Sequence, residues 1–280
     1  MCSRSVSAGE KAIEDELMKD GEGGYCLTLE QKKLVSVKQL DLNSLASIKS
    51  FCDDINSESK LNIDYLICNA GIMAVQTREE TVDGFEKQVG VNHFGHAYLV
   101  QQLYKKITTS AKDRDADVRI IILASSAHSM SSVRTEDLHY TNGRTYSAWG
   151  SYGQSKQCNV LYAKALEEKL RTDGFGTNVT AMSVHPGVIK TALWRNTAFS
   201  SNFIVSWFGD TFLMKKTIPQ GASTTLFAAL SPVTKSNDYR GAYCVDCNKE
   251  DPCVAARDYT LAQTLLKVTM KQLEEKTANL

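Results

Sequence analysis

Residues 118–126 read VRIIILASS, a run of valine, isoleucine and leucine that ends in an alanine and two serines. A continuous apolar run of this kind is typical of a strand that is buried on both faces of a parallel sheet. Four further β-rich runs flank it, and two of these stop at a glycine turn signal. They cover residues 33–42, 63–71, 178–187 and 241–246.

Longer amphipathic stretches lie between the predicted strands and have the residue spacing of helices. They cover residues 8–19, 44–56, 80–107, 152–172, 220–230 and 256–275. Strands that alternate with helices form a parallel sheet that is covered on both faces. Because no repeat, linker or low-complexity tract interrupts this order, we expect a single α/β domain over residues 1–280, with a Rossmann-like, doubly wound parallel sheet.

The composition argues against several classes of protein. Of the 280 residues, 32 are lysine or arginine and 32 are aspartate or glutamate, so the net charge is zero, and no basic stripe indicates a nucleic acid partner. No apolar run is long enough to cross a bilayer. The eight cysteines lack the spacing of a disulfide framework, which predicts reduced thiols and a cytoplasmic location.

Metal binding is not expected from the sequence. Cys244 and Cys247 form a CVDC pair, but no second pair accompanies them. His93 and His96 share a helix face, but no third ligand stands at a suitable position.

Polar residues collect where the predicted strands end, which is where ligands of such sheets bind. They are NAG at 69–71, SS at 125–126 and HPG at 185–187. The helix that follows the second of these sets opens with Tyr152 and Lys156, which are four residues apart and therefore lie on one face.

This pair predicts proton transfer. A neighbouring ammonium stabilises a phenolate, so Lys156 is expected to lower the pKa of Tyr152 from about 10 toward neutral. Such a phenol can exchange a proton with a carbonyl or alcohol oxygen, and a serine hydroxyl at a neighbouring strand end can bind the same oxygen. The combination suits hydride transfer, for which a cofactor supplies or accepts the hydride.

Seven motifs in a fixed order resemble the short-chain dehydrogenase/reductase superfamily, from about residue 2 to residue 250. They are LDL, ICNAGIM, VNHFGHAYLV, ASSAH, SYGQSK, SVHPGVIKT and PQGASTTLF. The chain is most similar to the group that contains the retinol dehydrogenases and the WW-domain oxidoreductase. The resemblance implies an oxidoreductase that interconverts an alcohol and a carbonyl on an apolar substrate such as a retinoid, a steroid or a lipid aldehyde.

The resemblance also implies a role for individual residues. Tyr152 matches the catalytic acid/base of the family, and Lys156 matches the residue that tunes it and holds the nicotinamide ribose. Ser126 matches the serine that polarises the substrate, with Ser125 as the alternative one position earlier. Asn92 matches the asparagine that helps to hold a proton-relay water.

Further positions match the cofactor contacts of the family. Arg4 matches an arginine that faces the 2′-phosphate of NADP, which suits its planar fork of donors and favours NADP over the alternative, NAD. The full set of matched cofactor positions is Arg4, Asp41, Leu42, Asn69, Ala70, Gly71, Tyr152, Lys156, Pro186, Gly187, Val188 and Thr191.

One departure from the family stands at the amino terminus. The strand and glycine-rich turn that hold the pyrophosphate in this family are not found before Asp41, and GEGG at 21–24 follows a helical pattern instead. The sheet is therefore expected to lack its first strand-turn-helix unit and most of the second strand. Strand 33–42 would then lose its partner or pair with strand 63–71, which would otherwise become an exposed edge.

This departure leaves a second function open. The chain is either an oxidoreductase or a non-catalytic fragment or interaction protein on the same fold. A membrane anchor in the missing part would make the protein membrane-associated instead of cytoplasmic. The helices at 80–107 and 152–172 match the usual dimer faces of the family, which implies a homodimer by analogy.

Two loops carry the remaining expectations. The resemblance implies that residues 192–219 form a substrate lid, and 199–216 are rich in aromatic residues; contact with a membrane surface and ordinary core are the alternatives. His128 and His139 are interpreted as surface residues of the loop 127–150, with substrate contact as the alternative.

Overall fold

A mostly parallel sheet of five strands forms the centre of the computed structural model, which describes residues 1–17, 27–189 and 216–280. The strand order is β3-β4-β5-β6-β7, and only the last pair is antiparallel. The strands are β3 (Tyr65–Cys68), β4 (Val118–Leu123), β5 (Val179–His185), β6 (Tyr243–Val245) and β7 (Asn248–Glu250). The first four lie inside strands that the sequence predicts, so the predicted parallel α/β sheet is confirmed.

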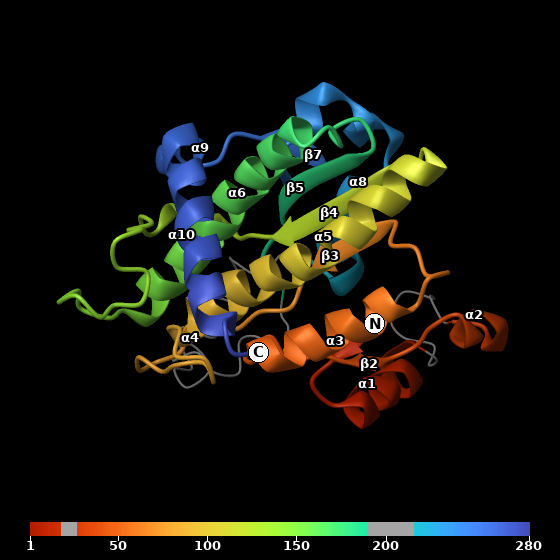
Figure 1. The fold of residues 1–280 in the computed structure, drawn as a ribbon, viewed down its shortest axis with the longest axis horizontal. Coiled ribbons are helices and arrows are strands. Elements are labelled where there is room, and N and C mark those ends of the chain that lie inside the picture. Colours follow the sequence, from red (N-terminus) through yellow and green to blue (C-terminus); the bar gives the residue numbers. More distant parts are fainter. Residues whose placement is uncertain (18–26, 190–215) are drawn as a thin grey trace.

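Helices cover the sheet on both faces, with α5, α6 and α10 on the near side in Figure 1. Along β4 the side chains alternate between two cores, because successive residues of a strand point to opposite faces. Ile120 and Ile122 join the core formed with α3, α5, α6 and α10, whereas Ile121 and Leu123 pack with α8. The helices are α1 (Val6–Ala12), α2 (Leu29–Lys33), α3 (Leu45–Ser57), α4 (Lys87–Val89), α5 (Gly95–Arg114), α6 (Ala148–Thr172), α8 (Ile218–Leu230), α9 (Val254–Arg257) and α10 (Tyr259–Thr277).

A separate sheet of two short strands lies beside the main one. Here β1 (Cys2–Ser3) pairs in parallel with β2 (Lys38–Gln39). The strand predicted over 33–42 is therefore shorter than expected. The expectation that it loses its partner, or pairs with strand 63–71, is wrong, because Cys2–Ser3 supplies the backbone hydrogen bonds.

The free edge of β3 agrees with the sequence prediction. Among the described residues no strand pairs with the outer edge of β3, so β3 is the outermost strand of the main sheet. Its side chains are correspondingly open, with Tyr65 46% and Ile67 40% exposed.

The long helix predicted over 80–107 begins later than expected, at Lys87 in α4. Glu86 is the N-cap that starts the helix here, because its carboxylate accepts hydrogen bonds from the backbone N–H groups of Gln88 (3.0 Å) and Val89 (2.9 Å). Such a cap satisfies donors that the first turn of a helix leaves free. The chain then continues through the π-helical turn η2 (Gly90–Phe94) into α5.

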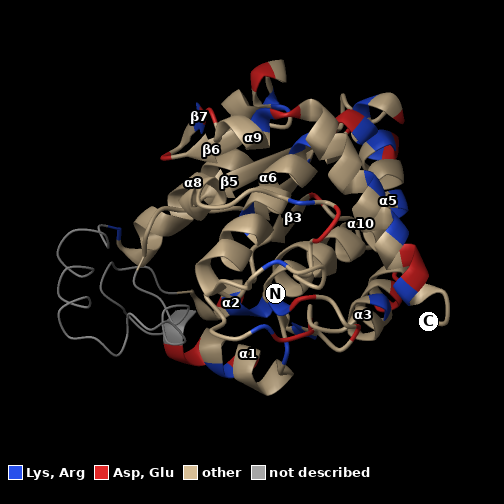
Figure 2. Ribbon diagram, turned by 90° about the vertical axis from the view of Figure 1, so that its left-hand side faces the viewer, with Lys and Arg blue, Asp and Glu red and all other residues tan. Residues whose placement is uncertain are grey.

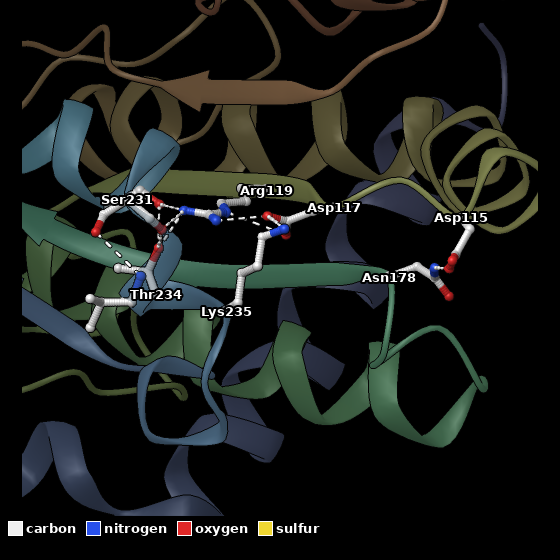
Figure 3. A network of polar contacts seen from close by, with 9 residues as sticks. Asp115, Asp117, Arg119, Asn178, Ser231, Thr234 and Lys235 are labelled. Atoms are coloured by element: carbon white, nitrogen blue, oxygen red, sulfur yellow. Dashed lines mark hydrogen bonds and ion pairs between the residues drawn. The ribbon is translucent and has the colours of Figure 1, made fainter.

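A buried arginine joins β4 to the end of α8, as Figure 3 shows. Arg119 is 2% exposed, and its Nη1 donates to the carbonyl oxygens of Ala228 and Ser231 (both 2.9 Å) and to the Thr234 hydroxyl. Its Nη2 donates to Asp117 at 2.7 Å. Carbonyls at a helix end lack partners within the helix, and a cation there also matches the helix dipole.

Charges of both signs lie close together along the outer helix α5 (Figure 2), as expected for a solvated surface. Within residues 1–17, 27–189 and 216–280, no helix combines the length and the hydropathy that crossing a bilayer requires. The same residues contain no cluster of three metal-ligating side chains.

The Arg119 contacts lead to a stability prediction. Arg119→Met leaves the carbonyls at the end of α8 without their donor, whereas Asp117 keeps the Lys235 ammonium at 3.4 Å; buried acceptors that lose their partner cost about 1–3 kcal/mol. We expect urea denaturation to show a decrease of this size in the free energy of unfolding. Arg171→Met is the control, because Arg171 pairs with Glu168 on the surface and should have little effect. Equal stabilities of the two variants would contradict the prediction.

Candidate active site

A cavity of about 970 Å³ opens where β3, β4 and β5 end, and it extends to the two-stranded sheet. Its wall contains every predicted cofactor position that the structure describes. They are Arg4, Asp41, Leu42, Asn69, Ala70, Gly71, Tyr152, Lys156, Pro186, Gly187 and Val188. Thr191 lies outside the described residues. Segments that are far apart in the sequence therefore meet around one space, as expected for the carboxyl edge of a parallel sheet.

Helix α6 brings Tyr152 and Lys156 to this cavity. It begins four residues before the predicted start, because the Ser147 hydroxyl caps it by accepting from Gly150 N–H at 3.2 Å. A Cβ added at Gly153 would lie 2.7 Å from the carbonyl oxygen of Ala127, so only glycine allows this close packing. The contact sets Tyr152 beside the turn that follows β4.

The structure places Ser125, not Ser126, on the cavity wall with Tyr152 and Lys156. Strand β4 ends at Leu123, and Ser125 then caps the 3-10 turn η3 (Ser126–Ser129), with its Oγ accepting from Ala127 N–H at 3.2 Å. Ser126 is the first residue of that turn and is exposed. Of the two predicted serines, the position on the cavity wall favours Ser125, the alternative one position earlier, over Ser126.

The pKa of Tyr152 differs from the expectation. Burial raises the pKa of Tyr152, and a hydrogen bond with the Ser125 side chain opposes this rise. Lys156 Nζ is 5.8 Å from the centre of the Tyr152 ring and donates instead to the Leu123 carbonyl at 3.0 Å. The expected decrease toward neutral is thus not found in this arrangement, in which desolvation of the phenolate has the largest effect on the pKa of Tyr152.

Lys156 is itself strongly affected by its surroundings. It is 5% exposed, and burial lowers its pKa from 10.5 to about 8. The Leu123 carbonyl that it binds also accepts from Asn159 Nδ2 at 2.8 Å, so the end of β4 holds α6 through two side chains.

Asn92 is buried behind the cavity wall, in η2. Its side-chain oxygen accepts from Ile72 N–H at 2.8 Å, and its Nδ2 donates to the Ile72 carbonyl and to the Ser155 hydroxyl, both at 2.9 Å. The structure therefore does not bring Asn92 into the cavity with Tyr152. Asn92 holds the loop after β3 in place.

Helix α8 forms a wall of the cavity that was absent from the predicted site. The only sequence signals for it are the helical pattern over 220–230 and the PQGASTTLF motif. A Cβ at Gly221 would overlap Ile189, which shows how closely α8 packs against the chain after β5. The cavity-lining residues of this helix are Ile218, Gly221, Ala222, Thr225 and Leu226.

This wall suits a nicotinamide cofactor in part. Gly71 and Gly187 are both required locally: a Cβ at Gly71 would lie 2.9 Å from Asn92 Oδ1, and Gly187 has φ +88°, a conformation that favours glycine. The Lys156 ammonium has three donors and uses one on Leu123, so donors remain for ribose hydroxyls. Within the described part of the wall there is no glycine-rich turn of the kind that binds a pyrophosphate.

Comparison with known proteins agrees with this geometry. The family model for "short chain dehydrogenase" matches residues 25–200. The chain is 38% identical to the short-chain dehydrogenase TIC 32 A, chloroplastic, of Brassica napus over 84% of this chain and 71% of that protein. It is 34% identical to mouse retinol dehydrogenase 12 over 96% of this chain and 76% of that protein.

Solved structures show the same fold. A protein of Mycobacterium paratuberculosis superposes with a TM-score of 0.67 at 27% identity, over 98% of this chain and 83% of that one. The NADPH-bound carbonyl reductase from chicken fatty liver gives a TM-score of 0.54 at 17% identity, over 89% and 94% of the two chains, which concerns the fold alone. With these matches, the chain belongs to the short-chain dehydrogenase family of oxidoreductases, near the retinol dehydrogenases.

Proposed function

We propose that this oxidoreductase interconverts an alcohol and a carbonyl on an apolar substrate, with NADP preferred over NAD. The observation that carries the proposal is the meeting of Ser125, Tyr152 and Lys156 on one cavity wall. The Tyr152 hydroxyl donates a proton to a carbonyl oxygen, or accepts one from an alcohol, and the Ser125 hydroxyl binds the same oxygen. The nicotinamide cofactor, when bound, supplies or accepts the hydride.

The chemistry of these residues agrees with such a role. Because burial raises the pKa of Tyr152, its hydroxyl keeps its proton at neutral pH and is ready to donate it. In this proposal Lys156 holds the ribose hydroxyls of the cofactor. Asn92 keeps the loop at Asn69–Gly71 against the cofactor.

An apolar substrate suits the rest of the wall. Met73, Val91, Ile189, Ile218 and Leu226 line the same cavity and offer hydrocarbon surface. The relatives named retinol dehydrogenases point to the same class of substrate. The proposed lid over 192–219 lies almost entirely outside the described residues, as does most of the segment 199–216 proposed for membrane contact.

A homodimer through α5 and α6 stays a proposal by analogy. Within this chain α10 packs on α6, as Figure 1 also shows, so a dimer that used α6 would have to include α10.

The second candidate is a non-catalytic interaction protein. It is favoured by the exposed edge of β3 and by the lack of a pyrophosphate-binding turn in the described cavity wall. Titration of NADPH against the purified chain, followed by nicotinamide fluorescence, separates the two. Micromolar binding supports the enzyme, and no binding at millimolar NADPH supports the interaction protein.

Tyr152→Phe tests the acid/base role. The variant keeps the ring but loses the exchangeable proton, so we expect kcat to fall by about 10²- to 10⁴-fold while the Kd for NADPH changes little. Tyr104→Phe is the control, because the Tyr104 hydroxyl contacts Asp173 on the surface. Turnover by Tyr152→Phe at the rate of the unchanged protein would refute the assignment.

Lys156→Met tests the cost of the buried charge. The folded pKa of Lys156, about 8, lies below its ordinary 10.5, so the unfolded state binds more protons between these pH values. The destabilisation is complete below pH 8 and fades as the pH rises to about 10.5. We expect the variant to be inactive but more stable than the unchanged protein at pH 7, by about 3 kcal/mol.

The Leu123 carbonyl keeps Asn159 as a donor in this variant, so no new buried group loses its partner. Chemical denaturation at pH 7 and pH 10 measures the difference, with Lys105→Met on the surface of α5 as the control. A variant that is less stable than the unchanged protein at pH 7 would argue against a buried ammonium.

Arg4→Gln tests the cofactor preference. Arg4 lies on the cavity wall next to β1 and is exposed, so its guanidinium is available to a ligand phosphate. The loss of a charge-assisted contact should raise the Kd for NADPH by about tenfold and leave the Kd for NADH almost unchanged. Equal changes in both dissociation constants would separate Arg4 from the 2′-phosphate.

A further inference from the structure

His128 lies three residues after Ser125 and is not the surface residue that the sequence predicts. It is 5% exposed, and its ring packs edge-on against Tyr243 of β6 at 4.9 Å between ring centres. The proposed reaction gives it no role, since it does not line the cavity that contains Tyr152. Its contacts nevertheless begin at Ser125.

Both hydrogen-bonding atoms of the His128 ring are in use. Nδ1 is 2.7 Å from the Ser125 carbonyl oxygen, which only accepts, so Nδ1 carries the proton. Nε2 lies 3.0 Å from the backbone N–H of Cys253, which only donates, so Nε2 is the acceptor. The two neighbours together fix a neutral ring with its proton on Nδ1. Burial also lowers the pKa of His128, in agreement with a neutral ring.

The bond to Ser125 fixes the direction in which this serine presents its hydroxyl. Its carbonyl accepts from His128 twice, from the backbone N–H at 3.0 Å and from Nδ1 at 2.7 Å. Its Oγ accepts from Ala127 N–H. The peptide plane and the hydroxyl of Ser125 are therefore both held from the same turn, and the side-chain part of this restraint depends on the His128 ring.

The bond to Cys253 joins this turn to the carboxyl-terminal part of the chain. Cys253 precedes α9, 125 residues away from His128. Gln157, the residue after Lys156, reinforces the joint, since its Nε2 donates to the His128 carbonyl and to Cys253 Sγ, both at 3.2 Å. The turn with Ser125, the helix with Lys156 and the segment before α9 thus meet at His128.

We propose that His128 is a positioning residue for Ser125, and that the N–H of Cys253 fixes its working tautomer. The proposal rests on the proposed function, because Ser125 matters only if it binds the substrate oxygen. It makes the segment at Cys253 part of the support of the active site, although no atom of that segment lines the cavity.

Two substitutions break the two bonds separately. His128→Phe keeps an aromatic ring against Tyr243 but removes both ring nitrogens. Cys253→Pro removes the backbone donor together with the thiol, whereas Cys253→Ala removes the thiol alone; Cys253 has φ −55°, which proline adopts. We expect each to lower kcat about tenfold, with a KM for NADPH within about twofold of the unchanged protein, since small misplacement of a catalytic group costs this much or more.

Non-additivity and rescue identify the mechanism. The double variant should lose no more than His128→Phe alone, because both changes act through one ring. His128→Asn should recover part of kcat, since its amide offers an N–H where Nδ1 stood. Cys253→Ala, which keeps the N–H, is the matched control and should retain most of kcat. Full activity in His128→Phe, or additive losses in the double variant, would overturn the proposal.

A measurement without turnover separates this proposal from the proposed function. The ¹⁵N chemical shifts of the His128 ring report which nitrogen carries the proton, with or without a substrate. We expect the Nδ1-protonated form in the unchanged protein and a mixture of tautomers in Cys253→Pro. An Nε2-protonated ring would overturn the proposal even if the protein is an active dehydrogenase. The expected tautomer in a protein without turnover would refute the proposed function alone.

Discussion

The carbonyl of Leu123 is the point on which the site depends. Leu123 is the last residue of β4, and its carbonyl oxygen accepts hydrogen bonds from Lys156 and Asn159, both on α6. The helix that carries Tyr152 is therefore fixed to the strand that leads to Ser125. The Lys156 ammonium loses its hydration when it is buried, and this desolvation lowers the free energy of unfolding. The contact that assembles the site is therefore made at a cost in stability. Such a conflict between stability and function is common where a charge must meet a ligand.

Much of the main sheet could be predicted from the sequence, because β4 and β5 are buried on both faces and consist mostly of apolar residues. The short strands could not be found in this way: Cys2–Ser3 and Asn248–Glu250 contain too few residues for a periodic pattern, and they form strands only because an edge is available. The start of the helix after Glu86 depended likewise on a capping contact.

The site was predictable as a set of strand ends but not in its details. Ser125 and Ser126 are neighbours in the sequence, and only the start of a 3-10 turn after Ser125 decides which one reaches the cavity. The pKa of Tyr152 depends on burial, which no residue spacing reveals. Similarly, His128 looks like a loop residue until Tyr243 and Cys253, both more than 100 positions away, enclose it.

Strand β4 has a part in two walls of the cavity. At one end Arg119 grips the last turn of α8, and at the other Leu123 holds α6. The five residues from Arg119 to Leu123 form a rigid segment, because all are buried and close-packed. A substitution that changes the packing of Ile120 or Ile121 would shift the contact of Arg119 with α8 and the contact of Leu123 with α6 together. Substitutions in the core could in this way change the shape of the cavity, and with it the choice of apolar substrate, while the residues that line the cavity stay the same.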